Sequence, residues 1–320
     1  MVNVAVAGGT GQLAREVIDA LLATGNHTIT ILSRHPSPSL PLYTNPLITH
    51  ITVDYTSLPS LTTALSTHKT HTVLSFIQAL SDPLGTAQIT LINACLASGV
   101  KRFAPSEYAC KSTTHLPFWG AKALVRSYLE RINTPIPVLE YTLFQPGLLL
   151  DYLAAPYRTS EHVTPLGTPF VVANRRAVVV SGHEDAVLVF TSARDVARGV
   201  TMMVGYEGVW PTVSGMRGGR VTFREVVGIC ERIRGRMEVE EVRVEDLKRG
   251  ELKLGWGLGG RHKAVEEERA EEMKRRVMVG ILMGCVDGDW DVGVEVNELF
   301  PGCEFEGVEA FLRRVWEGKE

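Results

Sequence analysis

The sequence predicts an α/β fold: a Rossmann-type doubly wound parallel sheet joined to a smaller C-terminal α+β portion. Three observations lead to this prediction. Segments with strand and helix patterns alternate through the first half of the chain. A glycine-rich turn follows the first apolar segment. Charged side chains are sparse where the sheet is expected, with 16 in residues 1–150 and 53 in residues 151–320.

The first half contains short apolar or β-branched runs separated by segments with helical periodicity. Six parallel strands are predicted, at Val2–Ala7, His27–Ser33, Ile48–Asp54, Thr72–Phe76, Arg102–Ala104 and Val138–Phe144. Between them, apolar spacing and terminal glycines predict helices from Leu13 to Gly25 and at Leu58–Leu65, Gly85–Ser98 and Ala121–Ile132. Four prolines in residues 35–47 predict a loop.

The second half mixes short strands with helices. Ala177–Ser181 and Val187–Thr191 are expected to form the two arms of a hairpin. Two capping boxes are expected at helix starts, Ser192 with Asp195 and Thr222 with Glu225. Gly235 is expected to end the second of these helices.

Composition excludes several classes of function. The chain has 320 residues, a net charge of -3 and 45% hydrophobic residues, so we expect a folded protein that does not bind nucleic acid. The N-terminus has no basic segment before its first strand, and no apolar run is long enough to cross a bilayer. We therefore expect a cytoplasmic protein without membrane contact. The five cysteines are scattered and form no CxxC pair, so neither a metal site nor a disulfide framework is expected.

The motif with the clearest chemistry is GGTGQLA at residues 8–14, placed between a predicted strand and a predicted helix. Gly8 allows a tight turn, and Gly11 lets backbone N–H groups approach a pyrophosphate at the positive end of the helix. A turn with a purely structural role is the alternative, but the strand, turn and helix around it favour nucleotide binding.

The end of the second strand indicates which dinucleotide binds. An NAD site usually has an acidic residue there, whereas this chain has Ser33, Arg34 and His35. A guanidinium group can pair with a 2′-phosphate, and no carboxylate is present to repel it. Arg34 therefore favours NADP(H), with a solvated arginine as the alternative.

Several segments together resemble a known family. They are GGTGQLA, ILSR, VDYTS, VLSFIQ, GVKRFAPSEYA, the lysine in WGAKALVRSYLE, and FQPGLLLDYL. They are similar to the NmrA-like and isoflavone reductase-like branch of the atypical short-chain dehydrogenases/reductases. The resemblance covers residues 1–155 and continues more weakly through FTSARDVARGV and the helix after Thr222.

This resemblance implies an NADP-binding Rossmann domain at residues 1–155 and a substrate-capping portion at 156–320, partly interleaved with the first. It implies an oxidoreductase of secondary metabolism that uses NADPH to reduce a small, apolar, aromatic or conjugated molecule, as a monomer or homodimer. Two alternatives stay open. One is a non-catalytic, NADP-sensing regulator of the NmrA type, and the other is a redox-neutral isomerase or cyclase.

The resemblance also implies individual roles. Lys122 matches the catalytic lysine of the family and would assist proton transfer; from the sequence alone it could equally be an exposed helix lysine. The implied cofactor-binding residues lie in the glycine turn, at or just past the ends of predicted strands, or at a helix start. They are Gly8, Thr10, Gly11, Gln12, Leu13, Arg34, Asp54, Tyr55, Phe76, Ile77, Ser106, Tyr108, Lys122, Phe144, Gln145 and Pro146.

The chain departs from related patterns in two places. Phe118 stands four residues before Lys122, where ordinary short-chain dehydrogenases have a catalytic tyrosine. Residues 35–50 contain no lysine, so Arg34 would hold the 2′-phosphate more nearly alone. Apolar and aromatic residues in 118–119 and 144–152 predict a cavity that opens onto the nicotinamide, with Lys122 at its polar edge.

Overall fold

The computed structural model describes residues 1–35, 45–257 and 267–319, which belong to two compact units. The first unit comprises Met1–Tyr108, Phe118–Phe144 and Ala197–Ser214. The second comprises Ala109–Pro117, Gln145–Val196 and Gly215–Glu320. The predicted division at residue 155 concerns cofactor and substrate binding, and it stays a prediction. Most of the predicted loop at 35–47 lies outside the described residues.

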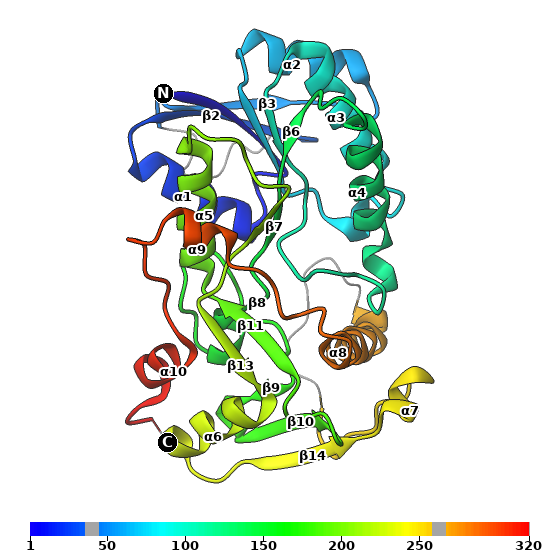
Figure 1. The fold of residues 1–320 in the computed structure, drawn as a ribbon, viewed down its shortest axis with the longest axis vertical. Helices are drawn as coiled ribbons and strands as arrows, with labels where there is room; N and C mark the ends of the chain where they lie inside the picture. Colours follow the sequence, from blue (N-terminus) through cyan, green and yellow to red (C-terminus); the bar gives the residue numbers. More distant parts are fainter. Residues whose placement is uncertain (36–44, 258–266, 320) are drawn as a thin grey trace. The chain divides into compact units, whose positions relative to one another are not determined.

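A six-stranded parallel sheet forms the first unit, as predicted (Figure 1). Its strand order is β3-β2-β1-β4-β5-β6, so the order reverses between β1 and β4, where α/β sheets bind ligands. Val4 of β1 pairs with Ile29 on one side and with Thr72 on the other. The strands are β1 (Val2–Ala7), β2 (His27–Ser33), β3 (Ile48–Thr52), β4 (Thr72–Ser75), β5 (Arg102–Ala104) and β6 (Glu140–Tyr141).

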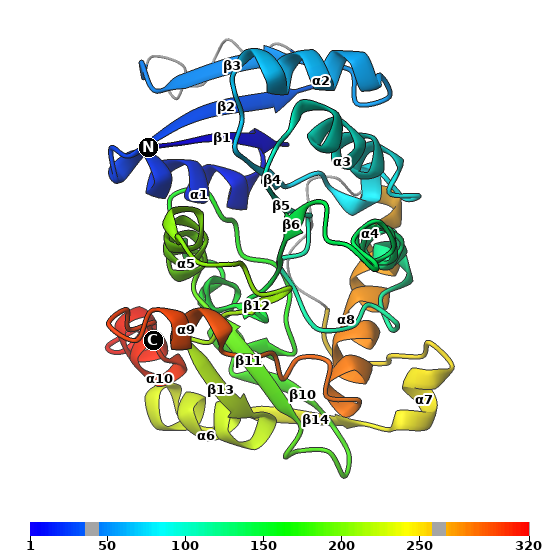
Figure 2. The ribbon, with the colours of Figure 1, turned by 45° about the horizontal axis from the view of Figure 1, so that its top comes forward.

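Helices cover both faces of this sheet (Figure 2). Residues of α2, α3 and α4 share one buried apolar cluster with alternate strand residues such as Ala5 and Val73. Ile18 of α1 lies with Ile31 beside Gly9, on the opposite face. The four helices begin and end within about two residues of the predicted positions. They are α1 (Gln12–Ala23), α2 (Leu58–Thr67), α3 (Thr86–Ser98) and α4 (Gly120–Ile132).

The predicted strand Val138–Phe144 is wrong as a single element. It divides at Thr142, whose backbone N–H still bonds to Phe103 of the sheet while its buried hydroxyl lies 2.7 Å from that of Ser214. Beyond this point, β7 (Leu143–Gln145) leaves the six-stranded sheet and pairs with β12 (Val213–Gly215). A second pairing partner, absent from local sequence, therefore overrides the continuous apolar pattern.

The predicted hairpin of Ala177–Ser181 and Val187–Thr191 is also wrong. Both segments are strands, but β10 pairs in parallel with β14, and β11 pairs with β13 and β8. The two three-stranded sheets of the second unit are β14-β10-β9 and β13-β11-β8. Their strands are β8 (Leu148–Leu149), β9 (Phe170–Val171), β10 (Arg176–Val180), β11 (Val187–Thr191), β13 (Gly219–Thr222) and β14 (Glu238–Val242).

Further helices follow in the second half, and capping residues begin two of them. The α-helices are α5 (Ala193–Gly205), α6 (Phe223–Arg234), α7 (Val244–Lys248), α8 (Ala270–Val286), α9 (Glu295–Leu299) and α10 (Val308–Trp316). Short 3-10 turns lie at Ala79–Ser81, Pro117–Trp119, Leu150–Ala154, Val172–Asn174 and Glu267–Arg269. Thr222 and Glu225 form the predicted capping box, and Gly235 ends α6. The Ser192 hydroxyl accepts the N–H of Asp195 at 3.0 Å.

Two further observations concern the described part of the chain. None of its helices combines the length and the apolar character that crossing a membrane requires. The five cysteines all lie within it and form no disulfide there, and four of them are buried.

The capping box yields a test of local stability. Thr222→Ala removes the hydroxyl that accepts the N–H of Glu225, so it should destabilise the protein by about 1 kcal/mol. Thr222→Ser keeps a capping hydroxyl and should stay near wild type. Urea unfolding followed by circular dichroism measures both variants; equal losses would contradict the capping role.

Candidate functional site

The glycine turn lies directly against the end of β4. Gly8 has a φ of 74°, and a Cβ built there would lie 2.8 Å from the carbonyl oxygen of Phe76 and 3.2 Å from the nitrogen of Ile77. Only glycine satisfies both the left-handed backbone and this approach. Two hydrogen bonds shape the turn, from Gly8 N–H to the Leu32 carbonyl and from Gly11 N–H to the Gly8 carbonyl. The structure thus brings together Gly8, Phe76 and Ile77, three of the predicted cofactor-binding residues.

The start of α1 suits an anion. Gly11 is its N-cap, and within the described residues no side chain caps it and no acidic residue stands in its first turn. Backbone N–H groups there, including those of Thr10, Gln12 and Leu13, can donate to a phosphate, and the helix dipole favours negative charge at this end. These features fit the pyrophosphate of a dinucleotide.

Arg15 follows in the same helix and was missed by the sequence analysis. Its Nε atom is buried without a hydrogen-bond partner in the described part of the chain. A positive side chain near a helix N-terminus is unfavourable in isolation, and a bound anion would offset this cost. The signal available in the sequence was a basic residue four positions after Gly11.

Arg34 is exposed and directly follows β2. The Ser33 hydroxyl donates to the His35 carbonyl at 2.6 Å and lies 2.7 Å from the His50 ring nitrogen. Burial lowers the pKa of His50. The contact between the Ser33 hydroxyl and the His35 carbonyl spans Arg34, whose assignment to the 2′-phosphate stays a prediction.

Asp54 and Tyr55 follow β3 in the same unit and differ in exposure. Asp54 is exposed, and its carboxylate accepts hydrogen bonds from the Thr56 hydroxyl and N–H, which lower its pKa. Tyr55 is buried and donates to the Leu32 carbonyl at 3.1 Å; burial raises the pKa of its phenol. Leu32 thus links Tyr55 to the glycine turn, because its carbonyl also accepts from Gly8.

Lys122 is buried at the start of α4, with 6% of its surface exposed, so the alternative of an exposed helix lysine is wrong. Its Nζ donates to the Ser106 carbonyl at 2.9 Å and to the Glu107 carbonyl. The ammonium group also lies 4.9 Å from the centre of the Trp119 ring. The structure therefore brings Lys122 and Ser106, two of the predicted site residues, into contact.

A buried ion pair supports this arrangement and was missed by the sequence analysis. Glu107 is 1% exposed, and its carboxylate accepts from Arg126 Nε at 3.0 Å and from Arg126 Nη2. Arg126 stands four residues after Lys122, so both project from one face of α4. The pair fixes the residue whose carbonyl binds Lys122. The helical spacing was the only signal available in the sequence.

Gln88 of α3 connects the ends of two strands and was also missed. Its buried Oε1 accepts from the Ser75 hydroxyl at 3.0 Å and from the Ser106 N–H at 2.8 Å. Asp82 in turn accepts the backbone N–H of Gln88. This amide therefore sets the distance between β4 and the segment that binds Lys122.

Aromatic rings line the same region of the first unit. The rings of Phe76 and Tyr108 stack with centres 4.5 Å apart and an angle of 10° between their planes. The ring of Phe144 also stacks with that of Tyr108, with centres 5.9 Å apart. Trp210 contacts the Phe144 ring edge-on. Three predicted residues from three strand ends are thus in contact.

Gln145 and Pro146 follow Phe144 as the first residues of the second unit. The cavity expected beside Lys122 would involve residues of both units, and it stays a prediction. No group of His, Cys, Asp or Glu in the described ranges is arranged to hold a metal ion.

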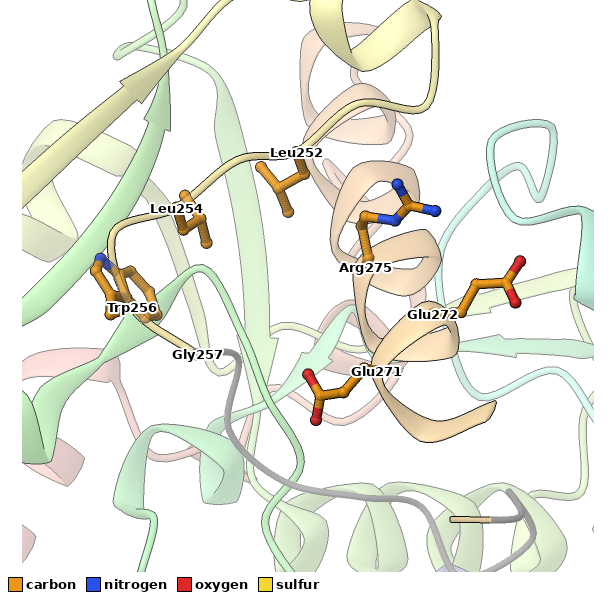
Figure 3. A pocket seen from close by; sticks show the side chains of 7 residues that line it. All are labelled: Leu252, Leu254, Trp256, Gly257, Glu271, Glu272 and Arg275. Carbon is orange, nitrogen blue, oxygen red and sulfur yellow. The ribbon is translucent and has the colours of Figure 1, made fainter. Parts of the chain in front are cut away.

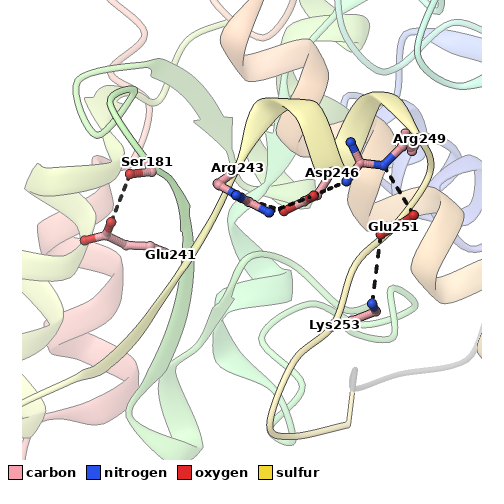
Figure 4. Close-up of polar contacts among 7 residues, drawn as sticks. All are labelled: Ser181, Glu241, Arg243, Asp246, Arg249, Glu251 and Lys253. Atoms are coloured by element: carbon pink, nitrogen blue, oxygen red, sulfur yellow. Dashed lines mark hydrogen bonds and ion pairs between the residues drawn. The ribbon is translucent and has the colours of Figure 1, made fainter.

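A pocket of about 390 Å³ lies in the second unit (Figure 3). Apolar side chains of Leu252, Leu254 and Trp256 face charged residues of α8 across it. None of the predicted site residues lines it. The chain leading to it carries exposed ion pairs, with Asp246 bound by Arg243 and Arg249 (Figure 4). Such pairs contribute little stability.

The glycine turn yields a test that separates strain from close approach. Gly25 also has positive φ, at 66°, but no atom lies within 4 Å of a Cβ built there. Gly25→Ala should therefore cost about 1–2 kcal/mol for the left-handed backbone alone. Gly8→Ala should cost at least about 1 kcal/mol more, because the Phe76 backbone must move. Urea unfolding measures both, and equal losses would show that the contact with Phe76 is unimportant.

Comparisons with known proteins identify the family of this chain. The model of the NmrA-like family matches residues 2–312. "Oxidoreductase BOA1" of Botryotinia fuckeliana is 34% identical over 240 residues, which cover 73% of this chain and 77% of that protein.

Solved structures share the fold. The structure described as "AtPrR2 with NADP+ and (+)pinoresinol" has a TM-score of 0.68 at 18% identity, covering 98% of both chains. The quinone oxidoreductase QOR2 of Escherichia coli, complexed with NADPH, has a TM-score of 0.69 at 18% identity, covering 98% of this chain and 100% of its own. With the family model spanning nearly all of the sequence, this chain belongs to the NmrA-like family.

Proposed function

We propose that this protein is an NADP-dependent oxidoreductase that reduces a small, largely apolar, aromatic or conjugated metabolite. The observation that carries the proposal is the buried ammonium group of Lys122, held on two backbone carbonyls in the unit that also contains the glycine turn. Burying a charge is costly. A buried lysine at the carboxyl edge of a parallel sheet is suited to holding or moving a proton during reaction.

The residues that would hold the cofactor follow from the site. Backbone N–H groups of Thr10, Gln12 and Leu13, assisted by Arg15, would bind the pyrophosphate, and Arg34 would pair with the 2′-phosphate. Asp54 and Tyr55 would lie beside the adenine. Phe76 and Ile77 would border the ribose. Ser106, Tyr108, Phe144, Gln145 and Pro146 would surround the nicotinamide and the substrate.

The chain's own part in the chemistry centres on one proton. Bound NADPH supplies a hydride, and this capacity belongs to the cofactor. Lys122 Nζ donates a proton to the substrate atom that gains negative charge. Its contacts with the carbonyls of Ser106 and Glu107 fix where that proton lies. Phe118 has no hydroxyl, so it cannot act as the proton donor.

The substrate class is supported by the aromatic lining and by the relatives. Phe76, Tyr108 and Phe144 provide flat apolar surfaces in the same unit as Lys122. One structural neighbour is named as bound to pinoresinol, and another as a quinone oxidoreductase. The proposal also includes a small-molecule substrate, without nucleic acid or membrane as a partner. The protein would be a monomer or homodimer in the cytoplasm.

Turnover of a substrate panel tests this function. NADPH is mixed with the protein and with quinones, unsaturated ketones or benzylic ethers, and both NADPH absorbance and product mass are followed. Loss of NADPH with a reduced product is expected. Binding of NADPH without turnover of any class would favour the sensing alternative, and a product of unchanged mass without NADPH loss would favour an isomerase.

Arg34 provides a test of cofactor choice. NADPH should bind at least about tenfold more tightly than NADH, since one charge-assisted contact contributes about 1.5–3 kcal/mol. Arg34→Ala should remove most of this preference, while Arg236→Ala, which removes an exposed arginine of the second unit, should not. Fluorescence titration measures the affinities. Equal affinities of the wild-type protein for both cofactors would exclude the role of Arg34.

Lys122 provides a test of proton transfer. Lys122→Ala should lower turnover of a true substrate by roughly a hundredfold, the scale expected for losing a positioned acid or base. NADPH affinity should change less than turnover. Lys101→Ala, at an exposed lysine of the same unit, is the control and should leave turnover unchanged. Steady-state kinetics at saturating NADPH decide the question; a variant with near-normal turnover would show that Lys122 has no catalytic role.

A further inference from the structure

The phenol of Tyr108 carries a buried hydroxyl group that makes no hydrogen bond within the described residues. Its hydroxyl oxygen is shielded from solvent and has no hydrogen-bond partner among the residues that the structure describes. Buried hydroxyls without partners are rare because they lose their bonds to water. Phenylalanine would stack on Phe76 and Phe144 equally well, so packing alone does not account for the hydroxyl.

Two other tyrosines of the same unit have hydroxyls with a hydrogen-bond partner. The Tyr55 hydroxyl donates to the Leu32 carbonyl, and the Tyr128 hydroxyl donates to the Asn93 side chain. Tyr108 also has a φ of 44°, a left-handed conformation that residues with a Cβ adopt at a cost. An unpartnered donor and a strained backbone therefore coincide in one residue, a combination typical of ligand sites.

The position of Tyr108 relates it to Lys122. The two residues immediately before it, Ser106 and Glu107, offer the carbonyls that bind the ammonium group. Its ring stacks on Phe76, whose carbonyl lies against Gly8. Within the first unit, Tyr108 is thus linked to the glycine turn through the ring of Phe76, and to Lys122 through the two residues that precede it in the chain. Burial raises the pKa of this phenol, which keeps it protonated and able to donate.

We propose that the Tyr108 hydroxyl donates a hydrogen bond to a carbonyl-type oxygen of the ligand bound beside Lys122. The acceptor is either the carboxamide oxygen of the nicotinamide or an oxygen of the substrate. Tyr108 thereby supplies, from the segment after β5, the hydroxyl that Phe118 lacks. The inference rests on the proposed function, because it needs a ligand in this site.

The test compares Tyr108→Phe with the matched control Tyr128→Phe. In the ligand-free protein, Tyr108→Phe should leave the thermal midpoint unchanged or raise it, because the hydroxyl has no bond to lose. Tyr128→Phe should lower the midpoint, because the bond to Asn93 is lost. This comparison requires neither cofactor nor substrate.

Ligand binding then identifies the acceptor. If the acceptor is the carboxamide, Tyr108→Phe should weaken NADPH binding about tenfold in a fluorescence titration, as expected for one buried hydrogen bond. If the acceptor is on the substrate, NADPH affinity should stay normal and kcat/KM for an oxygen-bearing substrate should fall about tenfold. Tyr128→Phe should change neither quantity.

Two results would overturn the assignment of Tyr108. One is a Tyr108→Phe variant with normal NADPH affinity and normal kcat/KM. The other is a ligand-free Tyr108→Phe variant that loses as much thermal stability as Tyr128→Phe, which would reveal a partner within the chain. Failure of the wild-type protein to bind NADPH would instead overturn the proposed function. The role of Tyr108 would then fall as well, because it needs a ligand in this site.

Discussion

Gly8 and the carbonyl of Phe76 approach so closely that a Cβ at position 8 would lie 2.8 Å from the oxygen. This contact lies where the strand order reverses between β1 and β4, so it joins the glycine turn to the strand end that precedes Phe76. Tyr108 stacks on that ring, and Ser106 and Glu107, just before it, hold Lys122. A larger residue at position 8 would therefore displace the glycine turn, and with it Phe76, Tyr108 and the segment that binds Lys122.

Glu107 contributes two different groups to the site, its side-chain carboxylate and its backbone carbonyl. The Glu107 carboxylate is bound by Arg126, while the Glu107 carbonyl accepts from Lys122. The two groups of Glu107 therefore have different functions: the ion pair with Arg126 holds the side chain in place, and the carbonyl binds the ammonium group of Lys122.

The sequence predicted the regular parts of the first unit well, because its strands and helices are defined by local patterns. β1, β2 and β5 have the predicted bounds, and the glycine turn lies where the motif placed it. The errors arose where contacts with distant segments determine the strand pairing. After Thr142, for example, the chain leaves the six-stranded sheet, because Thr142 contacts Ser214 and β7 pairs with β12. Gln88 and the ion pair of Glu107 with Arg126 were missed for the same reason, since no local pattern shows which side chains meet.

The aromatic residues and the buried lysine suit one kind of reaction. Hydride addition to an apolar, conjugated molecule creates negative charge in a region with few polar groups. A positive charge stabilises that developing charge more strongly there than it would in water. Flat rings such as those of Phe76 and Phe144 exclude water without offering competing hydrogen bonds. The same surroundings make the Tyr108 hydroxyl costly while the site is empty, so its bond to a ligand oxygen would add selectivity for oxygen-bearing molecules over purely apolar ones.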